Sequence, residues 1–331
     1  MTTSIGVIGA GAWGTALAQV YAVAGNPVTL WSRNDDVLWS VDFSRVNDTY
    51  LPGIRLDKNI TMTGDIQAAA QCDVILIVTP AQHLRTTLRA IKDQITPGKP
   101  VVLCCKGIEM ESGKMLSRVV AEETPLAETA ILTGPTFAGE VGRGLPSAAT
   151  LAAGSMEKAD ALAAILHSKT LRPYATDDVI GAELGGAVKN VIAIASGMIH
   201  GKGLGESARA ALVTRGLAEI TRLAVAMGGR RETLTGMCGM GDLILTCSSM
   251  QSRNFSLGAA LGEGRTLDDI LSERKTVTEG IHTARAVMVM AKDNGVDMPI
   301  SEMVEQCING EINVDQGMRL LMERPLKPEG I

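Results

Sequence analysis

A glycine-rich segment near the N-terminus constrains the fold of this chain more than any other feature. Residues 9–14 read Gly-Ala-Gly-Ala-Trp-Gly, which fits the spacing G-x-G-x-x-G, and they lie between an apolar run at 5–8 and an apolar helical stretch. In this context Gly9 permits a tight turn, Gly11 lets the backbone approach a pyrophosphate, and Gly14 allows the helix to pack closely on the strand. The segment therefore predicts a dinucleotide-binding turn rather than a turn kept for packing alone.

Two hydrophobic patterns divide the chain. In the first half short apolar runs alternate with amphipathic stretches, as in strand–helix units that build a parallel sheet, and from about Gly181 the pattern becomes helical. The predicted strands are residues 5–9, 27–32, 73–79, 100–105, 129–133, 147–153 and 172–175. The predicted later helices are residues 182–198, 207–227, 256–261, 267–271 and 279–294, with two short ones near the end. Since 331 residues favour two domains, we predict an α/β chain with a Rossmann-type doubly wound sheet domain at 1–180 and an all-α substrate domain at 181–331.

Composition and charge exclude several classes of partner. Only 3% of the residues are aromatic, the net charge is −5 and no basic block occurs, so we expect no nucleic-acid partner. The six cysteines form no C-x-x-C pair and the four histidines are scattered, so we expect reduced thiols and no metal. Residues 1–32 are uncharged, but glycines interrupt them and they lack the basic start of a signal peptide. We therefore expect a cytoplasmic protein without stable membrane insertion.

The end of the second predicted strand bears on the choice of cofactor. A dinucleotide fold usually has an acidic residue there, which binds the ribose 2′-hydroxyl of NAD. This chain has Arg33 at that position, and a guanidinium suits the 2′-phosphate of NADP. We therefore favour NADPH. NADH stays an alternative because Asp35 and Asp36 lie just beyond, and a solvated surface arginine is the non-functional explanation.

Residues that follow the predicted strands are candidates for ligand contacts, because ligands of open α/β sheets lie outside the carboxyl ends of the strands. Lys106 follows the strand at 100–105, and the small residues around Gly134 and Thr136 follow the strand at 129–133. Lys106 would bring a cation to this edge of the sheet, although a surface lysine is equally consistent with the sequence.

Lys189 is unusual because it lies in a predicted helix of small and apolar residues. Burial lowers the pKa of an ammonium and a nearby carboxylate raises it again, which can make a lysine a proton donor or acceptor; alternatively the side chain reaches water. Asp242 is an isolated carboxylate after a glycine turn, where it could also cap a helix. Three neighbouring side chains, those of Ser252, Arg253 and Asn254, offer enough hydrogen-bond donors to hold a phosphate. The non-functional explanation is a surface loop.

Taken together, these segments resemble the bacterial glycerol-3-phosphate dehydrogenase family over nearly the whole chain. In the family's order they are GAGAWGTALA at 9–18, YLPGI at 50–54, CKGIE at 105–109, GPTFAGE at 134–140, LGGAVKNVIAIASGM at 184–198, RGLAEI at 215–220, GMGDLILTC at 239–247, QSRN at 251–254 and TEG at 278–280. The resemblance implies reversible, NAD(P)H-dependent reduction of dihydroxyacetone phosphate, a small phosphorylated substrate, to sn-glycerol 3-phosphate for glycerophospholipid synthesis. A homodimer is the family-based expectation.

The resemblance also implies roles for individual residues. Lys189 is the general acid in reduction and the base in oxidation, Asp242 orients it or balances its charge, and Thr246 matches a substrate-side threonine. The implied substrate contacts are Lys106, Gly134, Thr136, Lys189, Asp242, Ser252, Arg253 and Asn254. The implied cofactor contacts are Gly9, Gly11, Trp13, Gly14, Arg33, Lys106, Ala138, Arg253, Val277 and Glu279.

Two other functions are compatible with the same plan. A dehydrogenase acting on a 3-hydroxy acid or a sugar acid would need a carboxylate-binding site in place of Ser252, Arg253 and Asn254. A nucleotide sensor would bind NADPH without turnover and could discard Lys189 and Asp242, yet both are present.

Overall fold

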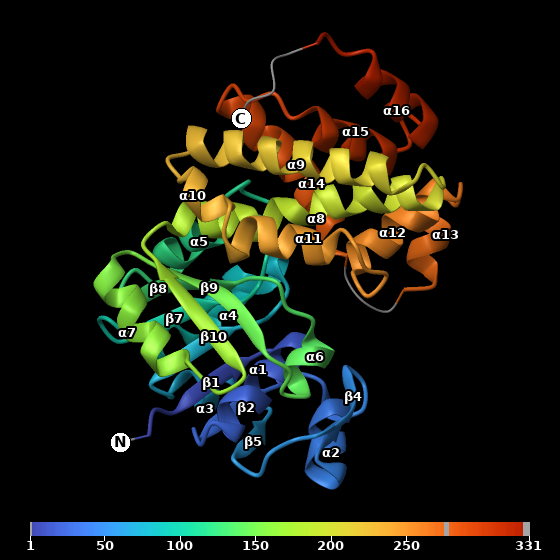
Figure 1. The fold of residues 1–331 in the computed structure, drawn as a ribbon. Helices are drawn as coiled ribbons and strands as arrows, with labels where there is room; N and C mark the ends of the chain where they lie inside the picture. The colour runs from blue at the N-terminus through green and yellow to red at the C-terminus, as the bar shows by residue number, and fades with distance from the viewer. Residues whose placement is uncertain (1, 275–277, 327–331) are drawn as a thin grey trace. The chain divides into compact units, whose positions relative to one another are not determined.

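The chain, for which a computed structural model describes residues 2–274 and 278–326, divides into two compact units (Figure 1). The first comprises Met1–Lys106 and Met115–Val179, and the second comprises Gly107–Lys114 and Ile180–Ile331. The first unit ends next to the domain boundary expected after residue 180. The assignment of Gly107–Lys114 to the second unit is not anticipated by the sequence patterns.

The first unit is built on one eight-stranded sheet. Its order is β10-β9-β8-β7-β6-β1-β2-β5, with β1 at Ile5–Ile8, β2 at Val28–Trp31, β5 at Ile60–Thr63, β6 at Val74–Ile77, β7 at Pro100–Leu103, β8 at Glu128–Thr133, β9 at Ser147–Ala153 and β10 at Leu171–Thr176. Neighbouring strands are parallel, except that β8 and β9 pair antiparallel. The strand order reverses at β1, because β2 lies on one side of it and β6 on the other. A ligand crevice is expected outside the carboxyl ends of these strands.

The predicted fold class of this unit is confirmed, since every predicted strand is present. β1 and β6 are wholly buried, as expected for central strands covered on both faces. The helices are α1 at Ala12–Val23, α2 at Asp35–Ser44, α3 at Ile66–Ala70, α4 at Leu84–Ile91, α5 at Leu116–Glu123, α6 at Ala138–Gly142 and α7 at Met156–Leu166, with 3-10 turns at Ala81–His83 and Lys92–Gln94. The sequence patterns miss the edge strand β5 and a separate pair, β3 at Val46–Asn47 and β4 at Leu51–Arg55. β4 contains Pro52 and Gly53, which are poor strand formers.

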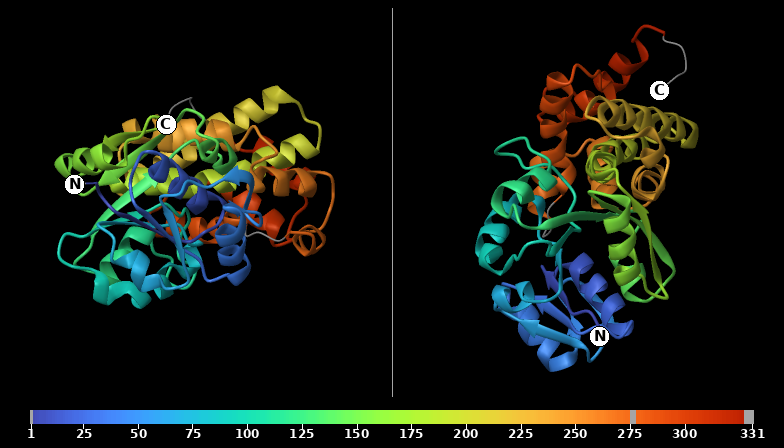
Figure 2. Two further views of the ribbon diagram at one scale, coloured as in Figure 1. Left: turned by 90° about the horizontal axis from the view of Figure 1, so that it is seen from below. Right: turned by 90° about the vertical axis from the view of Figure 1, so that its left-hand side faces the viewer.

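The second unit consists mainly of helices (Figure 2). They are α8 at Val179–Gly201, α9 at Glu206–Ala226, α10 at Arg231–Leu234, α11 at Asp242–Thr246, α12 at Arg253–Gly262, α13 at Leu267–Ser272, α14 at Glu279–Asp293, α15 at Pro299–Ile308 and α16 at Val314–Met322. The predicted helices are all present, and α10 and α11 are additional. α12 begins before the predicted start at residue 256, because Ser252 caps it through its side chain.

Helix α8 forms the core of the second unit. It is long and apolar enough to cross a membrane, but 89% of its most apolar window is buried inside the protein. Every residue from 181 to 199 is buried, including Lys189. This continuous burial explains why the helix is apolar on all sides.

Glycines bring α8 and α12 into backbone contact. A Cβ added at Gly197 would lie 2.0 Å from the Phe255 carbonyl oxygen, and one at Gly201 would lie 2.0 Å from the Ala259 oxygen. On α12, a Cβ at Gly258 would lie 1.9 Å from the Ile194 oxygen. Since such approaches exclude any side chain, these positions require glycine. The contact packs the N-terminal end of α12 against α8, the helix that carries Lys189.

A buried carboxylate on α9 caps α15. Glu219 accepts hydrogen bonds from the backbone N–H groups of Ile300 at 2.7 Å and Ser301 at 3.2 Å, and from the Ser301 hydroxyl at 3.1 Å. The N-cap residue of α15, Met298, makes no side-chain capping bond. Glu219 therefore satisfies amides that a helix N-terminus leaves without partners.

We expect the stability of the second unit to depend on the protonation of Glu219. Burial raises the pKa of Glu219 from 4.5 to about 7. Between these pH values the folded chain holds a proton that the unfolded chain releases, so the free energy of unfolding falls as the pH rises through this window. In Glu219→Gln this fall should shrink by roughly 1–3 kcal/mol. Urea unfolding at several pH values measures the free energy of unfolding of both proteins. A variant with the same pH dependence as the parent would contradict the prediction.

Candidate active site

Lys189 forms a buried ion pair with Asp242. Its Nζ donates to Asp242 Oδ1 at 2.5 Å and to Thr246 Oγ1 at 2.6 Å, and Thr246 Oγ1 donates to Asp242 Oδ1 at 3.2 Å. Lys189 is 5% exposed and Asp242 is 1% exposed. We call these three residues the lysine cluster. The structure thus brings together Lys189, Asp242 and Thr246, which lie far apart in the sequence.

Two helices position the lysine cluster. Asp242 and Thr246 lie one turn apart on α11, so their side chains share the face that meets Lys189 on α8. A π-helical turn at Met237–Gly241 leads into α11, and a Cβ at Gly239 would lie 2.0 Å from the Leu234 carbonyl oxygen. The turn also packs on α8, where a Cβ at Gly185 would lie 2.8 Å from the carbonyl oxygen of Cys238, and it thereby holds Asp242 against α8.

Cys247 lies directly after the lysine cluster but is not suited to act as a nucleophile. Burial raises the pKa of its thiol to about 12; the charge of Lys189 lowers this pKa by a smaller amount, and the charge of Asp242 raises it. The thiolate, not the thiol, is the reactive form. Among the described residues, no group of three or more histidine, cysteine, aspartate or glutamate side chains could hold a metal ion.

The N-terminal end of α12 carries the residues predicted to hold a phosphate. Ser252 Oγ caps the helix by accepting from the Phe255 N–H at 3.2 Å, and Arg253 is exposed in the first turn. Asn254 is buried, donates from Nδ2 to Asn190 Oδ1 at 3.0 Å and accepts from the Gly280 N–H at 3.0 Å. Asn254 therefore links α12 to the residue beside Lys189 and to the start of α14.

Three predicted residues of the first unit meet at the end of β8. Lys106 Nζ and Thr136 Oγ1 both donate to the carbonyl oxygen of Gly134 at 3.3 Å. A Cβ at Gly134 would lie 2.8 Å from Ala149 Cα, so this position needs glycine. The neighbouring Thr133 hydroxyl is buried and has no hydrogen-bond partner among the described residues. A cation and hydroxyl groups thus gather at the carboxyl edge of the sheet.

The glycine turn after β1 has the geometry that a pyrophosphate requires. Gly9 adopts φ +119°, which side chains rarely adopt, and a Cβ at Gly14 would lie 1.8 Å from the Gly9 carbonyl oxygen. A Cβ at Gly11 would meet no atom within 4 Å. Gly11 therefore borders open space at the N-terminus of α1, where the helix leaves N–H donors for an anion. These residues fit a dinucleotide.

A residue that the motif does not include holds this turn in place. Asn47 is fully buried and donates from Nδ2 to the carbonyl oxygen of Ala10 at 2.9 Å and to Thr15 Oγ1 at 2.8 Å. An asparagine in a polar loop gives no sequence signal for such a contact. Only the structure shows that the β3 residue supports the turn.

The other predicted cofactor contacts are found at element ends. Arg33 is exposed just after β2, and Asn34 caps α2 by accepting from the Asp36 N–H at 2.9 Å. Trp13 lies in the first turn of α1 and Ala138 begins α6, and both pack on the core of the first unit. Glu279 begins α14 in the second unit. Val277 lies outside the described residues.

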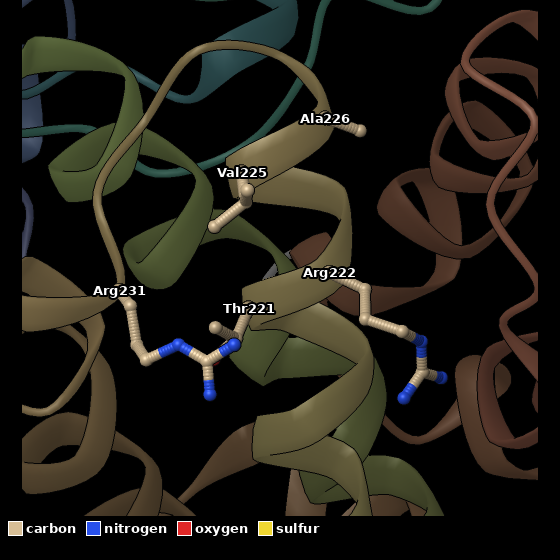
Figure 3. Close-up of a pocket in the computed structure, with 5 residues that line it drawn as sticks. All are labelled: Thr221, Arg222, Val225, Ala226 and Arg231. Carbon is tan, nitrogen blue, oxygen red and sulfur yellow. The ribbon is translucent and has the colours of Figure 1, made fainter. Parts of the chain in front are cut away.

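A pocket of ≈ 250 Å³ opens on the second unit along the end of α9 (Figure 3). Arg222 and Arg231 lie at its two sides and Val225 between them, while Thr221 and Ala226 complete its lining. None of the predicted site residues lines this pocket. It therefore forms no part of the candidate site.

The whole chain is similar to proteins of one family. The model "NAD-dependent glycerol-3-phosphate dehydrogenase N-terminus" matches residues 4–159, and the model "NAD-dependent glycerol-3-phosphate dehydrogenase C-terminus" matches residues 178–319. A glycerol-3-phosphate dehydrogenase [NAD(P)+] of Parvibaculum lavamentivorans is 53% identical over 98% of both chains, and one of Caulobacter vibrioides is 52% identical over 98% of both. The crystal structure of glycerol-3-phosphate dehydrogenase from Coxiella burnetii superposes with a TM-score of 0.92 at 37% identity, covering 98% of this chain and 99% of that one.

Proposed function

This chain belongs to the NAD-dependent glycerol-3-phosphate dehydrogenase family, and we propose that it uses Lys189 as the general acid and base of the family reaction. It is an NAD(P)-dependent oxidoreductase that reduces dihydroxyacetone phosphate reversibly to sn-glycerol 3-phosphate. The observation that carries the lysine assignment is the buried contact of Lys189 with Asp242 and Thr246. We further propose that residues 1–180 bind the dinucleotide and residues 181–331 supply the catalytic groups.

The geometry of the lysine cluster suits proton transfer. When bound, NAD(P)H supplies hydride to the carbonyl carbon. The ammonium of Lys189 meets the negative charge that develops on the carbonyl oxygen and gives its proton to that oxygen. Asp242 and Thr246 hold the ammonium at 2.5 Å and 2.6 Å and keep it directed. In the oxidation direction, neutral Lys189 takes the proton from the substrate hydroxyl.

We assign the substrate contacts to two groups of residues. Ser252, Arg253 and Asn254 hold the phosphate, because Arg253 offers a planar fork of donors at the N-terminus of α12, where the helix dipole also favours an anion. In the first unit, the substrate contacts are Lys106, Gly134 and Thr136. Lys189 and Asp242 complete the set.

The cofactor contacts follow from the glycine turn and the ends of neighbouring elements. Open space beside Gly11 supports a pyrophosphate at the N-terminus of α1. The remaining proposed contacts are Gly9, Trp13, Gly14, Arg33, Lys106, Ala138, Arg253, Val277 and Glu279. We also propose that the chain does not insert into a membrane, because the apolar helix α8 is buried core. A cytoplasmic homodimer is proposed on the family resemblance alone.

NADPH is the proposed cofactor because the exposed guanidinium of Arg33 follows β2. Arg33→Asp should lower kcat/KM with NADPH by about 100-fold, since the 2′-phosphate loses a cation and faces a carboxylate. With NADH, kcat/KM should be unchanged or higher. Steady-state kinetics with both cofactors measure the change, and Arg118→Asp, on the exposed face of α5, controls for added negative charge. Equal losses with both cofactors would contradict a specific 2′-phosphate contact.

The reaction itself is tested by following nicotinamide absorbance with purified protein. Oxidation of NADPH should require dihydroxyacetone phosphate, and unphosphorylated dihydroxyacetone should react at least about 100-fold more slowly, because it lacks the charge that Arg253 binds. If a 3-hydroxy acid or a sugar acid reacted faster than dihydroxyacetone phosphate, the assignment of a phosphate-binding site would be wrong. NADPH binding without any turnover would instead favour a sensor.

A further inference from the structure

The carbonyl oxygen of Cys247, at the C-terminal end of α11, accepts hydrogen bonds from two other helices. Ser196 Oγ on α8 donates to it at 2.9 Å, and Arg209 Nη1 on α9 donates to it at 3.5 Å. Ser196 is fully buried, and Arg209 also pairs with Glu206 one turn earlier on α9. Two side chains from separate helices therefore converge on the backbone oxygen that follows Thr246.

Helix α11 depends on such contacts for its position. It has only five residues, and a helix of this length is not stable by itself. Its last carbonyl groups lack intrahelical partners. Leu243 and the Cys247 side chain are buried and set which face of α11 meets the core, but apolar contacts have no direction and do not fix the position of its last carbonyl group. Directed hydrogen bonds at its end do.

Ser196 and the catalytic lysine face α11 from the same side of α8. Ser196 lies about two turns beyond Lys189, which returns its side chain to the same helix face. Helix α8 thus holds α11 at two points: Lys189 contacts Asp242 and Thr246, and Ser196 contacts the terminal carbonyl. A rotation of α11 that breaks the second contact also moves Thr246 away from Lys189.

We propose that Ser196 and Arg209 are positioning residues for proton transfer. They fix the end of α11 and thereby hold Asp242 and Thr246 in hydrogen-bonding distance of Lys189. The inference rests on the proposed role of Lys189 in the reaction. Neither residue is among the proposed substrate or cofactor contacts, so removing either should lower kcat rather than weaken substrate binding.

The first test is Ser196→Ala. We expect kcat for dihydroxyacetone phosphate reduction to fall about tenfold, with KM for both substrates within about threefold of the parent, because misplacement of a catalytic group slows chemistry more than binding. The matched control is Ser301→Ala. Ser301 is also fully buried and donates across to another helix, to Glu219 at 3.1 Å, but among the described residues it makes no hydrogen bond to α11. It should lose thermal stability and keep the parent kcat.

The second test changes Arg209, so that the inference can be judged even if Ser196→Ala fails to fold. Arg209→Met should lower kcat in the same way as Ser196→Ala, whereas Arg209→Lys should keep more activity than Arg209→Met, because the ammonium retains donors on a flexible stem. In the double variant Ser196→Ala, Arg209→Met, the fall in kcat should differ from the product of the single effects, because both donors share one acceptor.

Two results would overturn the positioning role. One is a parental kcat in both Ser196→Ala and Arg209→Met. The other is an equal loss of kcat in Ser301→Ala, which would show general destabilisation. An inactive Lys189 variant beside fully active Ser196→Ala and Arg209→Met variants would overturn this inference alone, whereas an active Lys189 variant would overturn the proposed function.

Discussion

Lys189→Met should lower kcat for dihydroxyacetone phosphate reduction by roughly 10²- to 10⁴-fold, the usual contribution of a positioned general acid. Methionine keeps an unbranched apolar stem but cannot donate a proton. The dissociation constant for NADPH should stay within about threefold of the parent, because the proposed cofactor contacts do not include Lys189. Stopped-flow kinetics and a fluorescence titration measure the two quantities separately. Turnover close to the parental rate would remove Lys189 from the mechanism.

A second consequence of Lys189→Met separates chemistry from folding. The substitution leaves the carboxylate of Asp242 buried, at 1% exposure, without its ammonium partner. Breaking a buried ion pair in this way typically costs about 3–5 kcal/mol. The double variant Lys189→Met, Asp242→Asn should recover most of this stability because it removes both charges. The double variant should remain as inactive as the single variant. A protein that regains stability without regaining activity would show that the loss of activity is not caused by unfolding.

Lys202→Met provides the matched surface control. Lys202 follows α8 and pairs with Asp315 at 2.7 Å, but the aspartate side chain is 69% exposed. Surface ion pairs contribute about 0–1 kcal/mol. This variant should therefore keep both its activity and its stability. A comparable loss of kcat and stability in Lys202→Met would show that the effects of Lys189→Met are not specific to the buried lysine.

The sequence predicts the sheet well because local patterns determine it. β1 and β6 are short apolar runs, and the glycine spacing after β1 reflects contacts within a few residues, such as the approach of Gly14 to Gly9. The long helix α8 is equally visible because a buried helix is apolar on all sides. Such signals need no knowledge of distant residues.

The site depends on contacts that local patterns do not encode. The pairing of Lys189 with Asp242 joins two helices across 53 positions, and the seating of the glycine turn by Asn47 joins residues 37 positions apart. A lone charged or amide residue in sequence does not reveal its partner. Helix α11 is also too short to give a helical pattern. Resemblance to a family singles out Lys189 and Asp242, but the roles of Ser196 and Arg209 follow only from the folded arrangement.

The glycines of the phosphate-binding turn should separate into two functional classes. Gly11→Ala should raise the dissociation constant for NADPH by about 100-fold, or roughly 3 kcal/mol, because the added Cβ would occupy the open space proposed for the pyrophosphate. Its own stability should change by less than about 1 kcal/mol, since φ is −69° and no protein atom lies within 4 Å of the new carbon. Fluorescence titration and thermal unfolding measure both effects.

Gly14→Ala is the matched substitution. In this variant we expect the loss of stability, and not the loss of NADPH affinity, to be the primary effect. Its Cβ would lie 1.8 Å from the Gly9 carbonyl oxygen, and such overpacking against backbone should destabilise the first unit by about 3 kcal/mol or more. Weak cofactor binding in this variant should therefore accompany unfolding, whereas in Gly11→Ala it should occur in a folded protein. If folded Gly11→Ala bound NADPH like the parent, the open space beside Gly11 would not be the pyrophosphate site. The turn would then serve packing alone, and the cofactor contacts would have to be sought elsewhere on the sheet edge.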